Sequence, residues 1–222
     1  MRKVFQAELT SIGEGLITMS HRVATAMEQA WEAFTTQDTE LAQEVIAGDA
    51  RIDFMQNELD ERAIDVLALQ GPVASDLRMT VGSLRMSASL ERMGDLARHI
   101  AQLARLRFPN AVAPESIVPT FADMAKLDIE LAHMLGDLLD TRDLSLARQI
   151  IEKNRKIDEL HSSVFRAVAS PEWDASAETT ADVTLTSRYL ERFGDHGVSV
   201  TRKVTYLVTG EWEPESAELP FN

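Results

Sequence analysis

The sequence contains no cysteine among its 222 residues. This absence excludes disulfide bonds, thiolate catalysis and thiolate metal sites, so oxygen or histidine must hold any bound metal. Basic residues are also scarce: 22 Lys and Arg stand against 36 Asp and Glu, and the formal net charge is −14. Such a charge repels phosphate backbones and anionic lipid surfaces, so we expect no nucleic-acid partner.

The chain also lacks a long apolar run. No segment approaches the ~18 unbroken apolar residues that a membrane-spanning helix needs. The opening residues, MRKVFQAELTSIGEG, carry polar groups where a secretory signal would have its apolar region. We therefore expect a cytoplasmic protein without direct membrane insertion, which reaches the inner face of the membrane only through protein partners.

Common catalytic and nucleotide-binding motifs are missing as well. The sequence contains no G-x-S-x-G, no P-loop and no Rossmann fingerprint. Hydrolysis through a serine triad and binding of ATP or a dinucleotide are therefore not expected, and we predict that the chain is not an enzyme.

What the sequence does contain is helical periodicity. Apolar residues recur at steps of three and four from Phe5 to Phe34, then from Leu41 to Leu69, and again from Leu77 to about Leu106. Thr36-Gln37-Asp38 offers a capping side chain between the first two runs, and Gln70-Gly71-Pro72 ends the second. These signals predict three long helices in the first half.

The second half repeats this organisation after a proline-rich linker, PNAVAPESIVP. One helix carries Phe121, Met124, Leu131, Leu135 and Leu138 and breaks at Thr141-Arg142-Asp143. A second helix runs to Pro171, and a third is expected from about Thr180 to just before Gly210.

The two halves also match in letters. TQDTELAQEVIAGDARID from Thr36 aligns without gaps on TRDLSLARQIIEKNRKID from Thr141, with seven of eighteen positions identical. We predict an all-α fold in which two tandem three-helix repeats form a pseudo-twofold six-helix bundle of up-down, spectrin-repeat-like helices. The predicted repeats are residues 1–108 and 119–210, followed by an acidic C-terminal tail, residues 211–222.

An acidic motif is duplicated on the third helix of each half. SLERMGD ends at Asp95 and YLERFGD ends at Asp195, one hundred positions later. In the first copy, Glu91 and Asp95 continue the apolar stripe of Leu77, Val81, Leu84 and Ala88. We therefore predict that these acids lie on the buried face of their helix.

The preceding helix of each half carries a second pair at the same spacing, Asp49 with Asp53 and Asn154 with Asp158. If the pairs of one half face each other, several carboxylates gather in one place, and such a cluster requires positive charge. Two sources stay open, a metal ion or ion pairs with basic side chains: Arg51, Arg92 and Arg98 in the first half, and Arg155, Lys156, Arg188 and Arg192 in the second.

Two further features favour the metal. Gly94 and Gly194 interrupt the acidic helices at a cost of ~1 kcal/mol each, which a close neighbour or a bound group would explain. Oxygen ligands without thiolate favour Mg²⁺, Mn²⁺, Ca²⁺ or iron over copper. His99 and His196, which lie beside the acids in sequence, are additional candidate ligands.

The duplicated unit, the motifs DARID and ERMGD, then KID and ERFGD, and the ASDLR that opens the third helix resemble the PhoU family over about residues 5 to 210. The resemblance implies a dimeric negative regulator of the phosphate-starvation response and modulator of phosphate uptake. Such proteins act between the ATPase subunit of the phosphate ABC transporter and a sensor histidine kinase, and this makes the chain an indirect regulator of transcription.

The resemblance also implies metal ions at the carboxylate clusters, with iron, manganese, magnesium or zinc as candidates. Carried over by motif, one site is Asp49, Asp53, Glu91 and Asp95. The other is Asp158, Glu191 and Asp195. Because Asn154 stands where the pattern has an acid, the second site is expected to bind more weakly or to hold fewer ions.

Two alternatives remain. A ferritin-like di-metal carboxylate oxidase would need Glu-x-x-His twice, and the chain has it once, at Glu130 to His133. A metal-free structural helical bundle would hold its acids in ion pairs instead.

Overall fold

The computed structural model describes residues 2–211, and within that range the chain forms six helices and no strand. The helices are α1 (Arg2–Thr36), α2 (Thr39–Gln70), α3 (Ala74–Arg107), α4 (Val118–Thr141), α5 (Leu144–Val168) and α6 (Ala177–Thr209). The predicted all-α fold of six helices is confirmed. None of the helices in this range is both long and apolar enough to cross a membrane.

The helices form because each presents an apolar stripe that a neighbour can cover. The stripe predicted on α1 is buried through Ile12, Leu16, Met19, Val23 and Met27, and the one on α4 is buried from Phe121 to Leu138. Burial of these stripes, rather than helix propensity, stabilises rods of this length.

The turns between the first two helices of each half are equivalent in detail. Asp38 accepts hydrogen bonds from the backbone N–H groups of Glu40 and Leu41, both at 3.0 Å, and Asp143 accepts one from Ser145 at 2.8 Å. The residue before each cap is left-handed: Gln37 has φ 59° and Arg142 has φ 57°. The duplication therefore extends from the letters to the backbone conformation.

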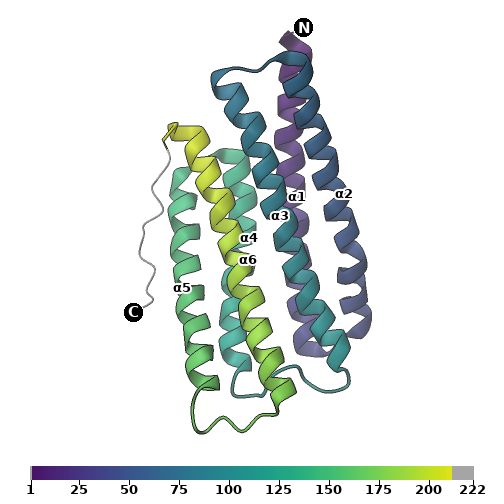
Figure 1. Cartoon of the computed structure of the whole chain (residues 1–222), viewed down its shortest axis with the longest axis vertical. Helices are drawn as coiled ribbons and strands as arrows, with labels where there is room; N and C mark the ends of the chain where they lie inside the picture. Colours follow the sequence, from purple (N-terminus) through teal and green to yellow (C-terminus); the bar gives the residue numbers. More distant parts are fainter. Residues whose placement is uncertain (1, 212–222) are drawn as a thin grey trace.

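Two three-helix groups lie side by side along a common long axis (Figure 1). Helices α1, α2 and α3 contact one another, as α4 does α5 and α6, and α3 packs on α6 while α1 packs on α4. Helices α2 and α5 therefore lie at opposite outer edges. Arg107 on α3 joins the halves, because its guanidinium bonds Asp182 on α6 through Nε to Oδ2 at 2.5 Å and through Nη2 to Oδ1 at 3.1 Å.

The predicted stripe on α3 is partly wrong. Leu77 and Val81 are about two-fifths exposed, and the apolar core positions of this helix are instead Met86, Leu90, Met93, Ala97 and Ile100. Glu91 and Asp95 therefore border the core and are half-buried, instead of lying within it.

Two helix starts also differ from the prediction. Helix α4 begins at Val118, inside the proline-rich linker, because Pro119 fits the first turn of a helix, where its missing N–H costs nothing. Helix α6 begins at Ala177, since Ser176 caps it by accepting a hydrogen bond from the Thr179 N–H. The acidic tail beyond Glu211 lies outside the described residues.

Candidate metal centre

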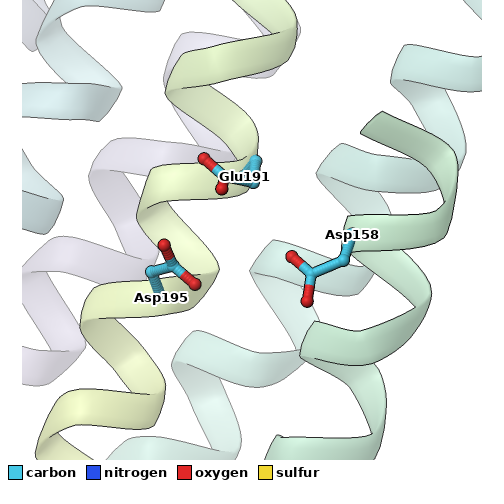
Figure 2. A group of neighbouring side chains, drawn as sticks. All are labelled: Asp158, Glu191 and Asp195. Carbon is cyan, nitrogen blue, oxygen red and sulfur yellow. The ribbon is translucent and has the colours of Figure 1, made fainter. Parts of the chain in front are cut away.

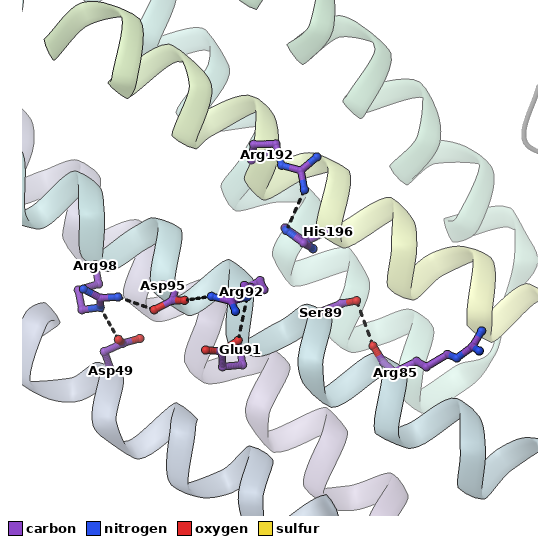
Figure 3. Close-up of polar contacts among 9 residues, drawn as sticks. All are labelled: Asp49, Arg85, Ser89, Glu91, Arg92, Asp95, Arg98, Arg192 and His196. Carbon is purple, nitrogen blue, oxygen red and sulfur yellow. Dashed lines mark hydrogen bonds and ion pairs between the residues drawn. The ribbon is translucent and has the colours of Figure 1, made fainter. Parts of the chain in front are cut away.

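The acids predicted in the first half, Asp49, Asp53, Glu91 and Asp95, are called cluster one below. Arginine side chains bridge three of them (Figure 3). Arg98 donates from Nε to Asp49 Oδ2 and from Nη2 to Asp95 Oδ1, each at 2.5 Å. Arg92 bonds Asp95 at 2.7 Å and lies 3.6 Å from Glu91. The Arg98 guanidinium therefore joins Asp49 on α2 to Asp95 on α3.

The pKa shifts follow from this arrangement. Burial raises the pKa of Asp49 despite the bond from Arg98, and burial together with the charge of Asp95 raises the pKa of Glu91. The pKa of Asp95 is lowered, because Arg98 and Arg92 outweigh its burial. Asp53 is exposed, yet its charge contributes to the raised pKa of both Asp49 and Glu91.

The acids predicted in the second half, Asp158, Glu191 and Asp195, are called cluster two. Asp158 projects from α5 toward the two acids on α6 (Figure 2). One carboxylate oxygen from each residue lies within 4.8 Å of the others, and within residues 2–211 no other set of three acidic or histidine side chains approaches so closely. This is the spacing of oxygen ligands around one cation.

Cluster two has weaker compensation than cluster one. Its arginine partners are more exposed than Arg98: Arg188 bonds Glu191 at 2.8 Å, and Arg192 bonds Asp195 at 3.2 Å. Burial and the charge of Asp195 raise the pKa of Glu191 to about 7, and the same two causes raise that of Asp158 to about 6. The site therefore holds excess negative charge that an added cation would stabilise.

A fourth acid, Asp128 on α4, lies beside cluster two and was missed in the sequence. It is fully buried, and neither carboxylate oxygen has a hydrogen-bond partner within the described part of the chain. Burial, and then the charges of Asp195 and Glu191, raise its pKa well above the ordinary value. The signal was present in the sequence, because Asp128 interrupts the apolar stripe between Met124 and Leu131.

Asn154 connects Asp128 with the cluster. Its Nδ2 faces Asp195 Oδ1 at 3.4 Å, and its buried Oδ1 lacks a hydrogen-bond partner among the described residues. A Cβ added at Gly194 would meet Oδ1 of Asn154 and Oδ1 of Asp128. The distance from this Cβ to Asp128 Oδ1 would be 3.3 Å. Gly194 is therefore needed for close approach. The same holds at Gly94, where an added Cβ would lie 2.9 Å from Ile52 Cδ1 and 3.2 Å from Asp49 Oδ1.

These donors fit a hard cation. Carboxylate and amide oxygens are the ligands that Mg²⁺, Mn²⁺ and Ca²⁺ prefer, and the orphaned oxygens of Asp128 and Asn154 are groups that such an ion would satisfy. In cluster one, a cation would have to displace or share the acids that Arg98 already binds.

The two candidate histidines lie outside this geometry. The ring of His99 packs 5.0 Å from the ring of Tyr189 on α6. His196 Nε2 lies 3.5 Å from the Arg192 guanidinium (Figure 3). Neither belongs to the close acidic group found among residues 2–211, so their role as ligands stays a prediction.

The single Glu-x-x-His does not form a shared site. Glu130 accepts a hydrogen bond from Lys153 on α5, whereas His133 Nε2 pairs with Glu28 Oε1 on α1 at 2.7 Å. Because the two side chains have different partners, nothing in their placement supports a di-metal oxidase centre.

Comparison with known proteins identifies the relatives of this fold. The PhoU domain model matches residues 16–104 and 121–204, so it occurs twice in the chain. A Mycobacterium leprae protein named phosphate-specific transport system accessory protein PhoU homolog 1 is 38% identical over 220 residues, covering 99% of each chain.

Two crystal structures are similar throughout. PhoU from Pseudomonas aeruginosa matches with a TM-score of 0.85 and 26% identity, over 93% of this chain and 100% of that one. The phosphate transport system regulatory protein PhoU from Streptococcus pneumoniae matches with a TM-score of 0.84 and 25% identity, over 94% and 99%. The predicted fold of two three-helix repeats is confirmed by these neighbours.

Proposed function

Because this chain belongs to the PhoU family, we propose that it is an accessory and regulatory protein of a phosphate transport system. Relatives that span nearly its whole length carry that role in their names, and this full-length similarity is the observation that carries the proposal. The chain modulates phosphate uptake and represses the phosphate-starvation response without turning over a substrate.

The proposed partners are the ATPase subunit of the phosphate ABC transporter and a sensor histidine kinase. The chain acts as a cytoplasmic adaptor between them, as a homodimer, and reaches the membrane through these proteins. The strongly acidic surface implied by a net charge of −14 supports docking to proteins over docking to nucleic acid or anionic lipid.

Binding of a hard divalent cation accompanies this role. Cluster two supports it through three carboxylates within 4.8 Å and through orphaned oxygens at their edge. Cluster one remains a proposed second site, at which the ion competes with Arg98. Iron, manganese, magnesium and zinc are the ions to test.

A phosphate-starvation reporter in phosphate-rich medium tests the regulatory role. Deleting the gene should switch the reporter on, and the wild-type gene should silence it again. If the reporter stays silent after deletion, the regulatory role is refuted.

The same reporter tests the metal. Genes carrying Glu191→Ala with Asp195→Ala should fail to silence it if the cation is required, and Glu91→Ala with Asp95→Ala gives the matching test of cluster one. A control pair, Asp137→Ala with Asp140→Ala, changes two exposed acids of α4 and should silence the reporter normally. Elemental analysis of the purified protein identifies the metal independently of the reporter.

A further inference from the structure

The two halves differ in many residues, and three pairs of corresponding positions change the charges at or beside the acidic clusters. Helix α2 aligns with α5 at an offset of 105 residues, so Asp49 corresponds to Asn154. Because the preceding turns are equivalent, the same offset applies to α1 and α4, where Val23 corresponds to Asp128. The offset of 100 residues between the Leu-Glu-Arg-x-Gly-Asp motifs pairs Arg98 with Val198.

The first exchange relocates an acid. Cluster one has its buried acid on α2, where Asp49 is 7% exposed, and the α1 position that corresponds to Asp128 holds the buried apolar Val23. In the second half the α2 equivalent is the neutral Asn154, and the acid is on α4 instead. Each half therefore keeps four acids, but those of the second half come from three helices.

The second exchange removes the guanidinium that corresponds to Arg98, and only the more exposed Arg188 and Arg192 pair with the acids of cluster two. Arg98 binds Asp49 and Asp95 from within cluster one, whereas Val198, at the corresponding position of α6, has no charge. Both oxygens of the fully buried Asp128 are left without a hydrogen-bond partner among residues 2–211. A buried carboxylate close to the acids Glu191 and Asp195 is unfavourable, so Asp128 either takes up a proton or has a positive group beside it.

We propose that Asp128 is a ligand of a divalent cation held between α4, α5 and α6, together with Asn154 Oδ1 and the carboxylates of cluster two. This inference rests on the metal binding proposed above and extends it to a residue outside the paired motifs. It reverses the asymmetry expected from Asn154 alone: the second half binds the cation more tightly than the first, because the first already contains a guanidinium.

Titration of the purified full-length protein with Mn²⁺ tests this proposal. Binding is measured by calorimetry and by the loss of the electron paramagnetic resonance signal of free Mn²⁺. Asp128→Asn keeps the size of the side chain and removes its charge. The dissociation constant of the tightest Mn²⁺ site should rise roughly tenfold or more, because affinity follows the number of charged ligands. Asn154→Asp added to Asp128→Asn places the acid back on α5, as in the first half, and should recover part of the affinity.

Two further variants separate ligation from packing. Asp128→Val introduces the residue of the equivalent α1 position, so the metal-free protein should unfold at the same or a higher temperature, while Mn²⁺ should raise that temperature less than it does in the wild type. Asp182→Asn removes another buried acid, one bound by Arg107, and should leave Mn²⁺ affinity unchanged.

The outcomes separate this inference from the function on which it rests. If Asp128→Asn binds Mn²⁺ as tightly as the wild type while Glu191→Ala with Asp195→Ala does not bind it, Asp128 is not a ligand and the metal site itself stands. If the wild type binds no Mn²⁺, Mg²⁺, Fe²⁺ or Zn²⁺, the cation proposal fails as a whole, and the phosphate reporter still decides the regulatory role.

Discussion

Replacing Arg98 with methionine should destabilise the metal-free protein by about 3 kcal/mol, because Arg98 is the guanidinium at the centre of cluster one. Its Nε and Nη2 atoms each lie 2.5 Å from a carboxylate oxygen, of Asp49 and Asp95. Methionine keeps most of the length of the side chain and removes only the charge and its hydrogen bonds.

The size of this loss in stability follows from the burial of the three side chains. Removing one partner of a buried ion pair costs roughly 3–5 kcal/mol, whereas an exposed pair contributes about 0.2–1 kcal/mol. The side chains of Arg98, Asp49 and Asp95 are 24%, 9% and 15% exposed, so the loss should fall near the lower end of the buried range. Arg92 bonds the same Asp95 but is 62% exposed, and Arg92→Met should therefore cost less than about 1 kcal/mol.

Urea denaturation of the wild type and both variants, with and without Mn²⁺, measures these differences. Without the guanidinium, cluster one becomes available to the metal, and an ion at 100 times its dissociation constant adds about 2.7 kcal/mol per site. Mn²⁺ should therefore reduce the difference in free energy of unfolding between Arg98→Met and the wild type. Equal losses for the two arginine variants would refute the central role of Arg98, and a gap that Mn²⁺ leaves unchanged would refute cluster one as a metal site.

Three further perturbations test cluster two and the contact between the two halves. Because the pKa of Glu191 is raised to about 7 and that of Asp158 to about 6, the folded metal-free protein holds protons on these two acids that the unfolded chain has already released. Their contribution to the free energy of unfolding should therefore fall between about pH 4 and pH 7 and then level off, as urea denaturation across pH of the wild type and of Glu191→Ala with Asp195→Ala will check. Gly194→Ala should lower the free energy of unfolding by roughly 1–3 kcal/mol and weaken Mn²⁺ binding, because the added Cβ meets the Asn154 side chain. Gly48 faces open space, so the control Gly48→Ala should raise the free energy of unfolding by up to about 1 kcal/mol; thermal unfolding measures both. Arg107→Met should lower the midpoint of urea denaturation, because it leaves the buried Asp182 between the two halves without its arginine partner.

The helices could be predicted because their stripes and caps repeat. Asp38 caps α2 as the sequence indicated, Asp143 caps α5 at the predicted break, and the α1 stripe is buried through most of its length. The stripe of α3 could not be predicted by counting apolar residues, because its buried face contains Thr80, Ser83 and Ser87. Small hydroxyls can occupy a core when they bond backbone carbonyls of their own helix, as Ser83 does to Thr80 at 2.7 Å.

The approach of the cluster two acids and the arginines that pair with the acids could be predicted from sequence, but the one arginine that bridges two helices could not. Arg51, Arg92 and Arg98 were equivalent candidates by spacing, and only the packing of α2 on α3 selects Arg98 as the residue that bridges the helices. Arg51 instead lies over the ring of Phe54, with its guanidinium carbon 5.1 Å from the ring centre. Asp128 was overlooked because one acid within an apolar stripe resembles an ordinary gap in the pattern.

The differences between the halves are physically coupled. In the first half Arg98 already pairs with Asp49 and Asp95, whereas in the second half Val198 stands at the position that corresponds to Arg98, and both oxygens of Asp128 lack a hydrogen-bond partner among residues 2–211. Under the cation proposal, cluster one is neutralised in part by Arg98, whereas cluster two takes up a cation from solution, and metal availability should then change the stability of the second half.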